Sequence, residues 1–556
     1  MYIILLVGNI SIVTWLREAQ ALHTVPASGP SPKGRTNDDL LSMIEFASSA
    51  STAAPTAQKW AKVIDHTRCI GCHACTTACK SENEVPLSVT RTYVKYVDIG
   101  QFPQAHRAYQ VTRCNQCDDA PCTHACPTGA MFARSDGIVD FDKSVCIGCK
   151  ACIAACPYDA IFINPDDHSA EKCNFCAHRL DVGLEPACVV VCPTQAILVG
   201  DMNDASSEVA RIIHREPVTV RRPEKETHPK LFYKGANMAT LDPLAARRPD
   251  GGLFMWSEQG DESHQVPSGH PDAWNSSAAA VLSYDVVHRA PWDWRVSLYT
   301  WTKSVAAGAY LVPFLLGLLG LMGWTSPLWT LAAPIVGMVF LGLTGVLLIW
   351  DLEHPERFYM IFTRPQWRSW LVRGGFIIGG YSAVLGAHLL LGWWGSEQAL
   401  RLLAWAGVPL AAMTAMYTAF LFAQAKARDL WQNPLLPPHL LVQALLAGSG
   451  VLILVAAVFG IPVLPPLPWV FAASAAGHLF MVAGEHFTSS PTAHARLAHH
   501  EMTRGAFSKY YWAGIGLVVA SLFAPVIGMV GVLAGLLGLL SFEHAFVQGG
   551  QHAPLA

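Results

Sequence analysis

The chain has 556 residues and a formal net charge of −3 at pH 7. This length predicts several domains, and a charge so close to zero excludes the strongly basic surface that is typical of nucleic-acid-binding proteins. All 16 cysteines lie between residues 69 and 192, whereas the chain beyond residue 297 is rich in Leu, Ala, Gly and Val. The composition therefore predicts a polar, cysteine-rich part followed by a part that lies in a membrane.

Residues 1–57 predict an extension without a core of its own. Its first 16 residues include an apolar run that Asn9 interrupts and that is too short for a membrane span. No Lys or Arg precedes this run, so it fits a signal peptide poorly, and a start-site artefact explains it as well as a membrane anchor does. The following residues, 17–57, are rich in Ser, Ala, Thr and Pro, which predicts disorder.

Four groups of four cysteines mark a predicted domain at 58–200. The first and third groups follow the C-x2-C-x2-C-x3-C spacing of ferredoxins that bind [4Fe–4S] clusters. Three closely spaced thiolates wrap one cluster, and the fourth reaches the neighbouring cluster. Sixteen thiolates at four per cluster predict four [4Fe–4S] clusters, with no cysteine left over. The predicted ligands are Cys69, Cys72, Cys75, Cys79, Cys114, Cys117, Cys122, Cys126, Cys146, Cys149, Cys152, Cys156, Cys173, Cys176, Cys188 and Cys192.

Three other uses of these cysteines fit less well. The spacings are too short and regular for a disulfide framework, and a chain of this size folds without one. Zinc sites need well-separated pairs of ligands, not runs of three cysteines. The segment from Cys69 to His73 matches a c-type haem signature, but haem there would break the first group. Because the segment 125–130 recurs at 155–160 and 191–196, the domain is predicted to be an α+β, double ferredoxin-like fold.

Beyond this domain, residues 201–296 are rich in Pro, Gly and Asp, which predicts an extended strap. Residues 297–548 predict an all-α bundle of eight transmembrane helices, with tryptophans at the helix ends as in an aromatic belt. Residues 549–556 form the remaining tail. The apolar stretches are 298–322, 328–350, 371–394, 402–424, 439–460, 467–484, 510–526 and 529–547.

An even number of spans would place both termini and the cysteine-rich domain on one side of the membrane. The loops on that side carry many basic residues, whereas the opposite loops carry essentially Arg401 alone. By the positive-inside rule, the cysteine-rich domain is predicted to be cytoplasmic. If the arginines instead dock a partner, a periplasmic location stays open. The basic residues are Arg357, Arg364, Arg368, Arg373, Lys426, Arg428, Arg496, Arg504 and Lys509.

The cysteine groups resemble those of the electron-transfer subunits of DMSO, polysulfide and nitrate reductase complexes, over about residues 58–240. The segments 350–357 and 363–371 and the Gly-Glu-His sequence at 484–486 resemble the quinone-reactive anchors of the NrfD/polysulfide reductase type. The chain looks like a fusion of both subunits. Many nitrate reductase relatives replace one cysteine of the second group, but Cys122 is retained here. The resemblance implies the ligand sets Cys146, Cys149, Cys152 with Cys126; Cys114, Cys117, Cys122 with Cys156; Cys69, Cys72, Cys75 with Cys192; and Cys173, Cys176, Cys188 with Cys79.

An iron–sulfur chain needs an electron donor and an acceptor. The sequence shows no haem-ligand set, no flavin or nicotinamide fingerprint and no molybdenum domain, which predicts a catalytic subunit on a separate chain. Ionisable residues inside spans are costly and suggest function, so a quinone site on the cysteine-rich side is predicted, for menaquinone or ubiquinone. Alternatively, Lys303 snorkels, Tyr417 only packs, and Asp351 and Glu485 pair with loop arginines. The isolated His388 and His478 are interpreted as packing or helix-bonding residues. The predicted quinone residues are Lys303, Asp351, His354, Tyr417, Glu485 and His486.

The resemblance implies a redox subunit of a respiratory oxidoreductase complex in the bacterial inner membrane. Electrons would pass between the quinone pool and a molybdopterin-containing catalytic subunit. Two alternatives stay open at this point: an inert anchor for a ferredoxin module, and an energy-coupling module that moves protons. The substrate of the partner and the direction of electron flow also stay open.

Overall fold

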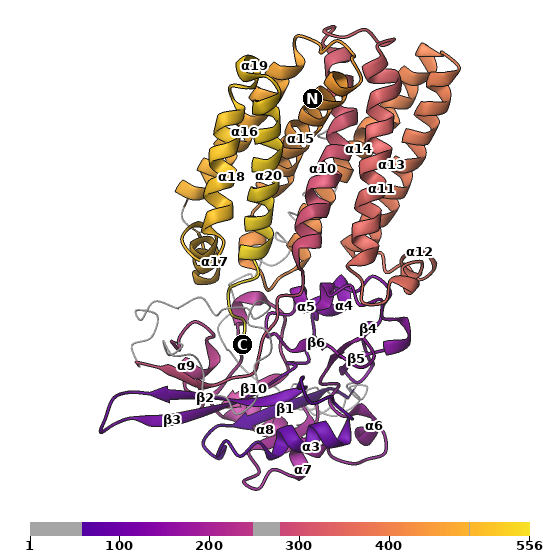
Figure 1. The fold of residues 1–556 in the computed structure, drawn as a ribbon. Coiled ribbons are helices and arrows are strands. Elements are labelled where there is room, and N and C mark those ends of the chain that lie inside the picture. Colours follow the sequence, from indigo (N-terminus) through magenta and orange to yellow (C-terminus); the bar gives the residue numbers. More distant parts are fainter. Residues whose placement is uncertain (1–57, 248–278, 489) are drawn as a thin grey trace, which may run out of the picture. The chain divides into compact units, whose positions relative to one another are not determined.

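The computed structural model describes residues 58–247, 279–488 and 490–556. The described residues belong to one unit, 57–556. The predicted extension 1–57 and residues 248–278 of the predicted strap lie outside them. Figure 1 shows a cysteine-rich α+β part, in indigo and magenta, next to a bundle of long helices, in rose, orange and yellow. This confirms the predicted fold class of a ferredoxin-like domain followed by a helical membrane part.

Two small sheets and two hairpins form the α+β part. β1 pairs in antiparallel fashion with β8 and in parallel with β10, so that one sheet has the order β8-β1-β10-β9. The second sheet has the order β11-β2-β3, and β4–β5 and β6–β7 are the hairpins. The strands are β1 (Trp60–Asp65), β2 (Thr92–Ile99), β3 (His106–Arg113), β4 (Met131–Ala133), β5 (Val139–Phe141), β6 (Ile161–Ile163), β7 (Ala170–Lys172), β8 (Ile197–Asp201), β9 (Val218–Thr219), β10 (Leu231–Lys234) and β11 (Val281–Tyr284).

Residues from the predicted strap complete both sheets. Strand β10 lies beside β1, with Tyr233 opposite Ile64, and β11 pairs with β2. Short helices connect these strands and follow the cysteine groups. They are α3 (Ala74–Glu82), α4 (Pro121–Ala125), α5 (Ala151–Ala155), α6 (Ala177–Leu180), α7 (Ala187–Val190), α8 (Glu208–Arg215) and α9 (Met238–Leu241).

Among the described residues, seven helices are long and apolar enough to cross a membrane. Each has at least 21 residues, which matches the roughly 20 that a bilayer requires. They are α10 (Trp294–Leu318), α11 (Ala333–Trp350, with a preceding π-helical turn Leu328–Ala332), α13 (Trp370–Trp393), α14 (Glu397–Gln424), α15 (Leu436–Val458), α16 (Leu467–Phe487) and α20 (Met529–Gly549).

The stretch expected to be a further span, 510–526, forms two shorter helices. α18 (Ser508–Ser521) has 14 residues and α19 (Ala524–Ile527) has four. Pro525 lies in the first turn of α19, and Gly528 adopts a positive φ of 61° before α20 begins, so the break lies where these residues predict it. Figure 1 shows α18 beside α20, with α17 (Ala493–Thr503) at its lower end. The structure therefore gives seven candidate spans and not the eight expected single helices.

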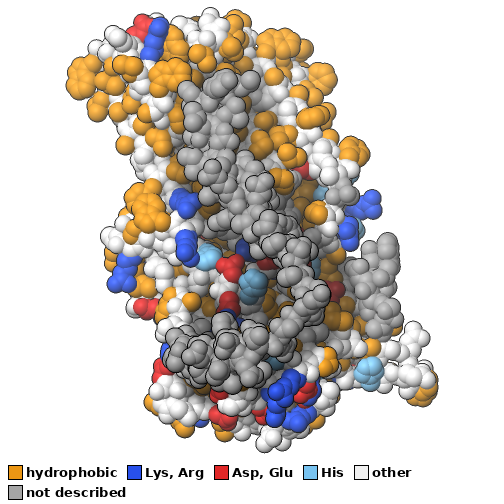
Figure 2. All heavy atoms as spheres, turned by 180° about the vertical axis from the view of Figure 1, so that it is seen from behind, with side chains coloured by type: hydrophobic (Ala, Val, Ile, Leu, Met, Phe, Trp, Pro, Cys, Tyr) orange, Lys and Arg blue, Asp and Glu red, His pale blue; other side chains and the backbone are white. Residues whose placement is uncertain are grey.

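The helical part presents apolar side chains outward, as a protein in lipid does. Phe480, Trp393 and Val526 are each at least 80% exposed. Figure 2 shows hydrophobic side chains over the upper, helical part and charged side chains gathered lower down. Inside the bundle, α10 packs so closely on α15 that a Cβ on Gly308 would lie 1.7 Å from the Ala444 oxygen. Small residues allow such close helix contacts in membranes.

Candidate functional site

The first and third cysteine groups adopt the same loop conformation. Gly71 and His73 have φ values of 71° and 58°, and Gly148 and Lys150 have values of 67° and 60°. The left-handed residues curve each loop so that its cysteines face inward, and a short helix follows. Two loops with the same unusual backbone confirm that the sequence repeat is also a structural repeat.

One cavity is lined by Cys126, Cys146, Cys149 and Cys152, which come from the second and third groups. Burial and the neighbouring thiolate of Cys126 both raise the pKa of Cys149. Three further pairs of thiols from different groups are also neighbours: Cys156 is near Cys114, Cys69 near Cys192, and Cys79 near Cys173. These neighbours match the ligand sets that the resemblance implies.

All sixteen cysteines are free thiols, so a disulfide framework does not form. Within the described part of the chain, no three His, Cys, Asp or Glu side chains converge on the position of a single metal ion. A [4Fe–4S] cluster requires a wider arrangement of ligands than a single metal ion, because each of its four irons binds one thiolate and the four thiolates surround the whole cube. The residues present therefore fit iron–sulfur clusters better than zinc.

Buried cations compensate for the charge of the fourth cysteine group. Arg113 is 2% exposed, and its Nη1 donates to Cys188 Sγ at 3.0 Å. Although burial opposes ionisation, Arg113 and Lys62 lower the pKa of the Cys188 thiol to about 7. A positive charge beside a thiolate favours the charged ligand form, and hydrogen bonds to cluster sulfurs help to set the reduction potential.

The third cysteine loop lies directly against the helical part. The indole Nε1 of Trp292 donates to the Cys149 carbonyl at 3.3 Å, and the His354 backbone N donates to the Ile147 carbonyl at 3.2 Å. Arg357 Nη1 donates to the Cys146 carbonyl at 3.0 Å. Any cluster held by this loop is therefore the one beside the membrane helices.

Asp351 and His354 lie in this contact and hold the two parts together. Lys150 Nζ is 3.5 Å from Asp351 Oδ1 and 3.0 Å from Glu353 Oε1. Burial raises the pKa of Asp351 to about 6, although the Lys150 ammonium opposes this shift. His354 interacts through Nδ1 with Glu356 and through Nε2 with the Asp167 carbonyl, each at 2.9 Å.

Lys303 and Tyr417 form a second, separate group inside the bundle. Lys303 is fully buried, and its Nζ donates to the Ala415 carbonyl at 2.8 Å and to Thr418 Oγ1 at 2.7 Å. The same ammonium lies 5.2 Å from the centre of the Tyr417 ring. The hydrogen-bond partners of Lys303 are thus on α14, whereas Asp351 pairs with the cysteine-rich part.

Glu543, on α20, is a buried carboxylate that the sequence analysis did not select. Its Oε2 accepts a hydrogen bond from Thr300 Oγ1 at 3.1 Å, while Oε1 has no partner among the described residues. Glu543 also interacts electrostatically with Lys303. The signal was present in the sequence, since an acidic residue within the apolar stretch 529–547 suggests function as Lys303 does.

Glu485 and His486 are neighbours in sequence but point to different surroundings. Glu485 Oε1 accepts from Asn433 Nδ2 at 3.1 Å and lies 3.3 Å from His439 Nδ1. The His486 ring is exposed and lies 5.2 Å from the His499 ring. The six predicted quinone residues therefore occupy several places and do not form one cluster.

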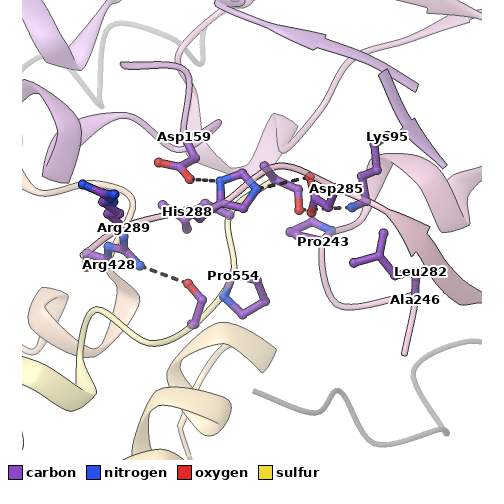
Figure 3. Close-up of a pocket in the computed structure, with 13 residues that line it drawn as sticks. Lys95, Asp159, Pro243, Ala246, Leu282, Asp285, His288, Arg289, Arg428 and Pro554 are labelled. Carbon is purple, nitrogen blue, oxygen red and sulfur yellow. Dashed lines mark hydrogen bonds and ion pairs between the residues drawn. The ribbon is translucent and has the colours of Figure 1, made fainter. Parts of the chain in front are cut away.

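A charged pocket lies where the cysteine-rich part, the segment 285–289 and the end of the chain meet (Figure 3). His288 interacts with both Asp159 and Asp285, the latter at 3.2 Å. Although burial opposes the charge, Asp285 and Asp159 raise the pKa of His288 to about 10. Arg428, from the helical part, donates to the Gln551 and Ala553 carbonyls at 2.7 and 3.0 Å.

Two family models match the chain. A "4Fe-4S dicluster domain" matches residues 105–202, and "Polysulphide reductase, NrfD" matches residues 284–536. A tetrathionate reductase subunit of Salmonella typhimurium is 41% identical over 208 residues, which are 36% of this chain and 80% of the relative. A polysulfide reductase polypeptide of Wolinella succinogenes is 42% identical over 179 residues, 32% of this chain and 94% of the relative. The thiosulfate reductase electron transfer subunit PhsB of Salmonella typhi is 46% identical over 157 residues, 28% of this chain and 81% of the relative.

Proposed function

Because the chain belongs to the family of 4Fe–4S dicluster electron-transfer subunits, here fused with an NrfD polysulfide reductase membrane domain, we propose that it passes electrons between a membrane quinone and a separate catalytic subunit. Its relatives belong to tetrathionate, polysulfide and thiosulfate reductases. In this proposal the catalytic partner is a molybdopterin-containing subunit that acts on a sulfur compound.

The observation that carries this proposal is the contact of the third cysteine loop with the membrane helices. Trp292, which precedes α10, bonds to the Cys149 carbonyl at 3.3 Å. Ser369, at the start of α13, likewise donates to the Ala125 carbonyl at 2.8 Å, directly before Cys126. Cys149 and Cys126 line the same cavity. The cluster that they hold therefore accepts or gives electrons at the membrane surface.

The four clusters are arranged as a linear path in this proposal. Cys126 and Cys156 exchange ligands between the clusters of the third and second groups. The second group joins the fourth through Gln116, whose Nε2 donates to the Cys173 carbonyl at 2.8 Å. Cys79 and Cys192 then exchange ligands between the fourth and first groups. The clusters supply one-electron transfer, and the protein sets their order.

The first group lies at the end of the path where a partner can dock. Cys72 is exposed, and the apolar side chains of Ile70 and Val190 are 56% and 59% exposed. Figure 1 shows α3, which follows Ile70 and Cys72, and α7, which ends at Val190, at the end of the cysteine-rich part farthest from the long helices. The catalytic subunit binds this surface and exchanges electrons with the cluster of Cys69, Cys72 and Cys75.

The quinone site is assigned to the buried group of Lys303, Tyr417, Thr418 and Glu543. An ammonium has three N–H donors, and the described residues accept two of those of Lys303, so the third serves a quinone carbonyl. Asp351 and His354 have a positioning role at the contact with the third cysteine loop. Glu485 and His486 lie apart from the quinone in this assignment.

The test uses the full chain, purified without oxygen and reconstituted in liposomes. A menaquinol analogue should reduce the clusters, as seen by loss of their visible absorbance. If the quinol leaves the clusters oxidised while dithionite reduces them, the helices are an inert anchor and the proposal is wrong. Mass spectrometry of proteins that co-purify with the tagged chain identifies the partner, which we expect to carry molybdopterin.

A further inference from the structure

Three titratable side chains of α15 and α16 form a hydrogen-bonded chain that runs into the bundle. Glu485 Oε1 lies 3.3 Å from His439 Nδ1, and His439 Nε2 lies 2.9 Å from His478 Nδ1. His439 and His478 are at most 1% exposed, whereas Glu485, near the end of α16, is partly exposed. His478 is therefore not isolated, as its sequence position suggested, but bonds from one helix to another.

The hydrogen-bond pattern assigns the protons on both rings. Glu485 also accepts a hydrogen bond from Asn433 Nδ2, so its oxygen acts as an acceptor and His439 Nδ1 donates to it. The other nitrogen of His439 must then accept, and His478 Nδ1 is its donor. Nε2 of His478 is left as a bare acceptor inside the bundle, where it has no partner among the described residues.

Two further buried acceptors without partners in the described part of the chain lie on neighbouring helices. They are Gln443 Oε1, one helical turn after His439 on α15, and Glu543 Oε1 on α20. Phe542, the residue before Glu543, packs against both His439 and His478, with ring centres 5.9 and 4.8 Å apart. Buried acceptors require donors, and internal water supplies them where several polar atoms gather.

We propose that Glu485, His439 and His478 form a proton relay between the surface at the end of α16 and the bundle interior near Glu543. The relay rests on the proposed function. Oxidation of a quinol gives a quinone, two electrons and two protons, and the electrons pass to the clusters. The two protons follow one after the other, and each reaches Nε2 of His478 through internal water; between them both rings turn back to their starting tautomers. The Nδ1 proton of His478 moves to His439 Nε2, and the Nδ1 proton of His439 moves to Glu485, which releases it to water.

The test compares three single variants of the full chain in liposomes. His478→Gln and Glu485→Gln keep hydrogen-bonding side chains but remove the proton carriers. His388→Gln is the matched control, since His388 is also fully buried in a span but both of its nitrogens have partners, Tyr310 at 3.1 Å and the Trp329 carbonyl at 3.0 Å. The measurements are quinol-driven cluster reduction, dithionite-driven reduction, proton release to an external dye, and rescue by small weak acids.

We expect quinol-driven reduction and proton release to slow at least tenfold in His478→Gln and Glu485→Gln, with partial rescue by azide or formate. His388→Gln and all dithionite rates should match the wild type. Wild-type rates in both relay variants, or slowing that weak acids do not relieve, would overturn the relay but leave the proposed function intact. If the wild type itself is not reduced by quinol, both proposals fall. If His478→Gln does not insert, Glu485→Gln, at the partly exposed end of α16, decides the result by the same criteria.

Discussion

The substitution Lys303→Met tests the assigned quinone site most directly. Methionine keeps most of the length and apolar bulk of lysine but removes the charge and the three N–H donors. In the structure, two of these donors bind Ala415 and Thr418, and the ammonium faces the Tyr417 ring. The substitution therefore removes the donor that we assign to the quinone carbonyl.

The expected magnitude follows from the bond that is lost. A hydrogen bond from a charged donor contributes about 1.5–3 kcal/mol. At about 1.36 kcal/mol for each tenfold change in rate, quinol-driven reduction should slow by about 10- to 150-fold. The burial of a charge opposes the stabilisation from its bonds, so we expect normal membrane insertion and full iron content in the variant.

The assay is stopped-flow reduction of the clusters by a menaquinol analogue, with dithionite as a route that bypasses the membrane. His388→Gln is the matched control, because His388 is also a fully buried polar residue of a span but lies outside the assigned quinone site. This control should slow quinol-driven reduction of the clusters much less than Lys303→Met does. A wild-type rate in Lys303→Met would refute the assignment, and the quinone site would then be sought around Glu485 and His486.

Three further predictions follow from other parts of the molecule. Anaerobically purified protein should contain about 16 iron and 16 acid-labile sulfide, four of each per cluster; a content near twelve iron, or stoichiometric zinc, would contradict four cubane clusters. A reporter fused after Ala556 should be active in the cytoplasm, since basic loops near span ends resist translocation; activity of a periplasm-only reporter would reverse this topology. Because Asp285 and Asp159 raise the pKa of His288 to about 10 from 6.5, the charged ring stabilises the fold fully below pH 6.5, and this stabilisation is lost as the pH rises through 10. Thermal unfolding of His288→Gln in detergent should therefore show less loss of stability over that range than the wild type.

The cysteine-rich fold was predictable because its signals are local. The spacing within each group describes a loop and a short helix, and repeated segments such as 125–130 and 155–160 describe two copies of one arrangement. Helix length and apolar composition likewise predicted the candidate spans. The division of 508–527 into α18 and α19 could be predicted only in part: Pro525 and Gly528 mark the turn before α20, but no residue type predicts that α18 ends at Ser521.

Contacts between distant elements were not predictable from these signals. The sequence placed Lys303 and Asp351 on the cysteine-rich side of their spans, but this does not say which faces of α10 and α11 meet. Lys303 instead meets α14, and Asp351 meets Lys150 of the cysteine-rich part. His439 and His478 meet because α15 and α16 pack side by side. The sequence does not show which residues of the two helices face each other, since only the packing of the bundle determines this. The pairing of β10 with β1 was unpredictable for the same reason, because it joins segments far apart in the sequence.

The reciprocal bonds between Gln551 and Trp292 bear on the order in which the protein is made. Gln551 accepts from the Trp292 backbone N at 3.0 Å and donates to its carbonyl at 2.9 Å, and so positions the residue whose indole bonds to the Cys149 carbonyl. A chain is synthesised from its amino end, so residue 551 emerges after every helix has been made. The two bonds that fix Trp292 against the third cysteine loop can therefore form only after all the described helices have been made, which makes them a late step in closing this contact.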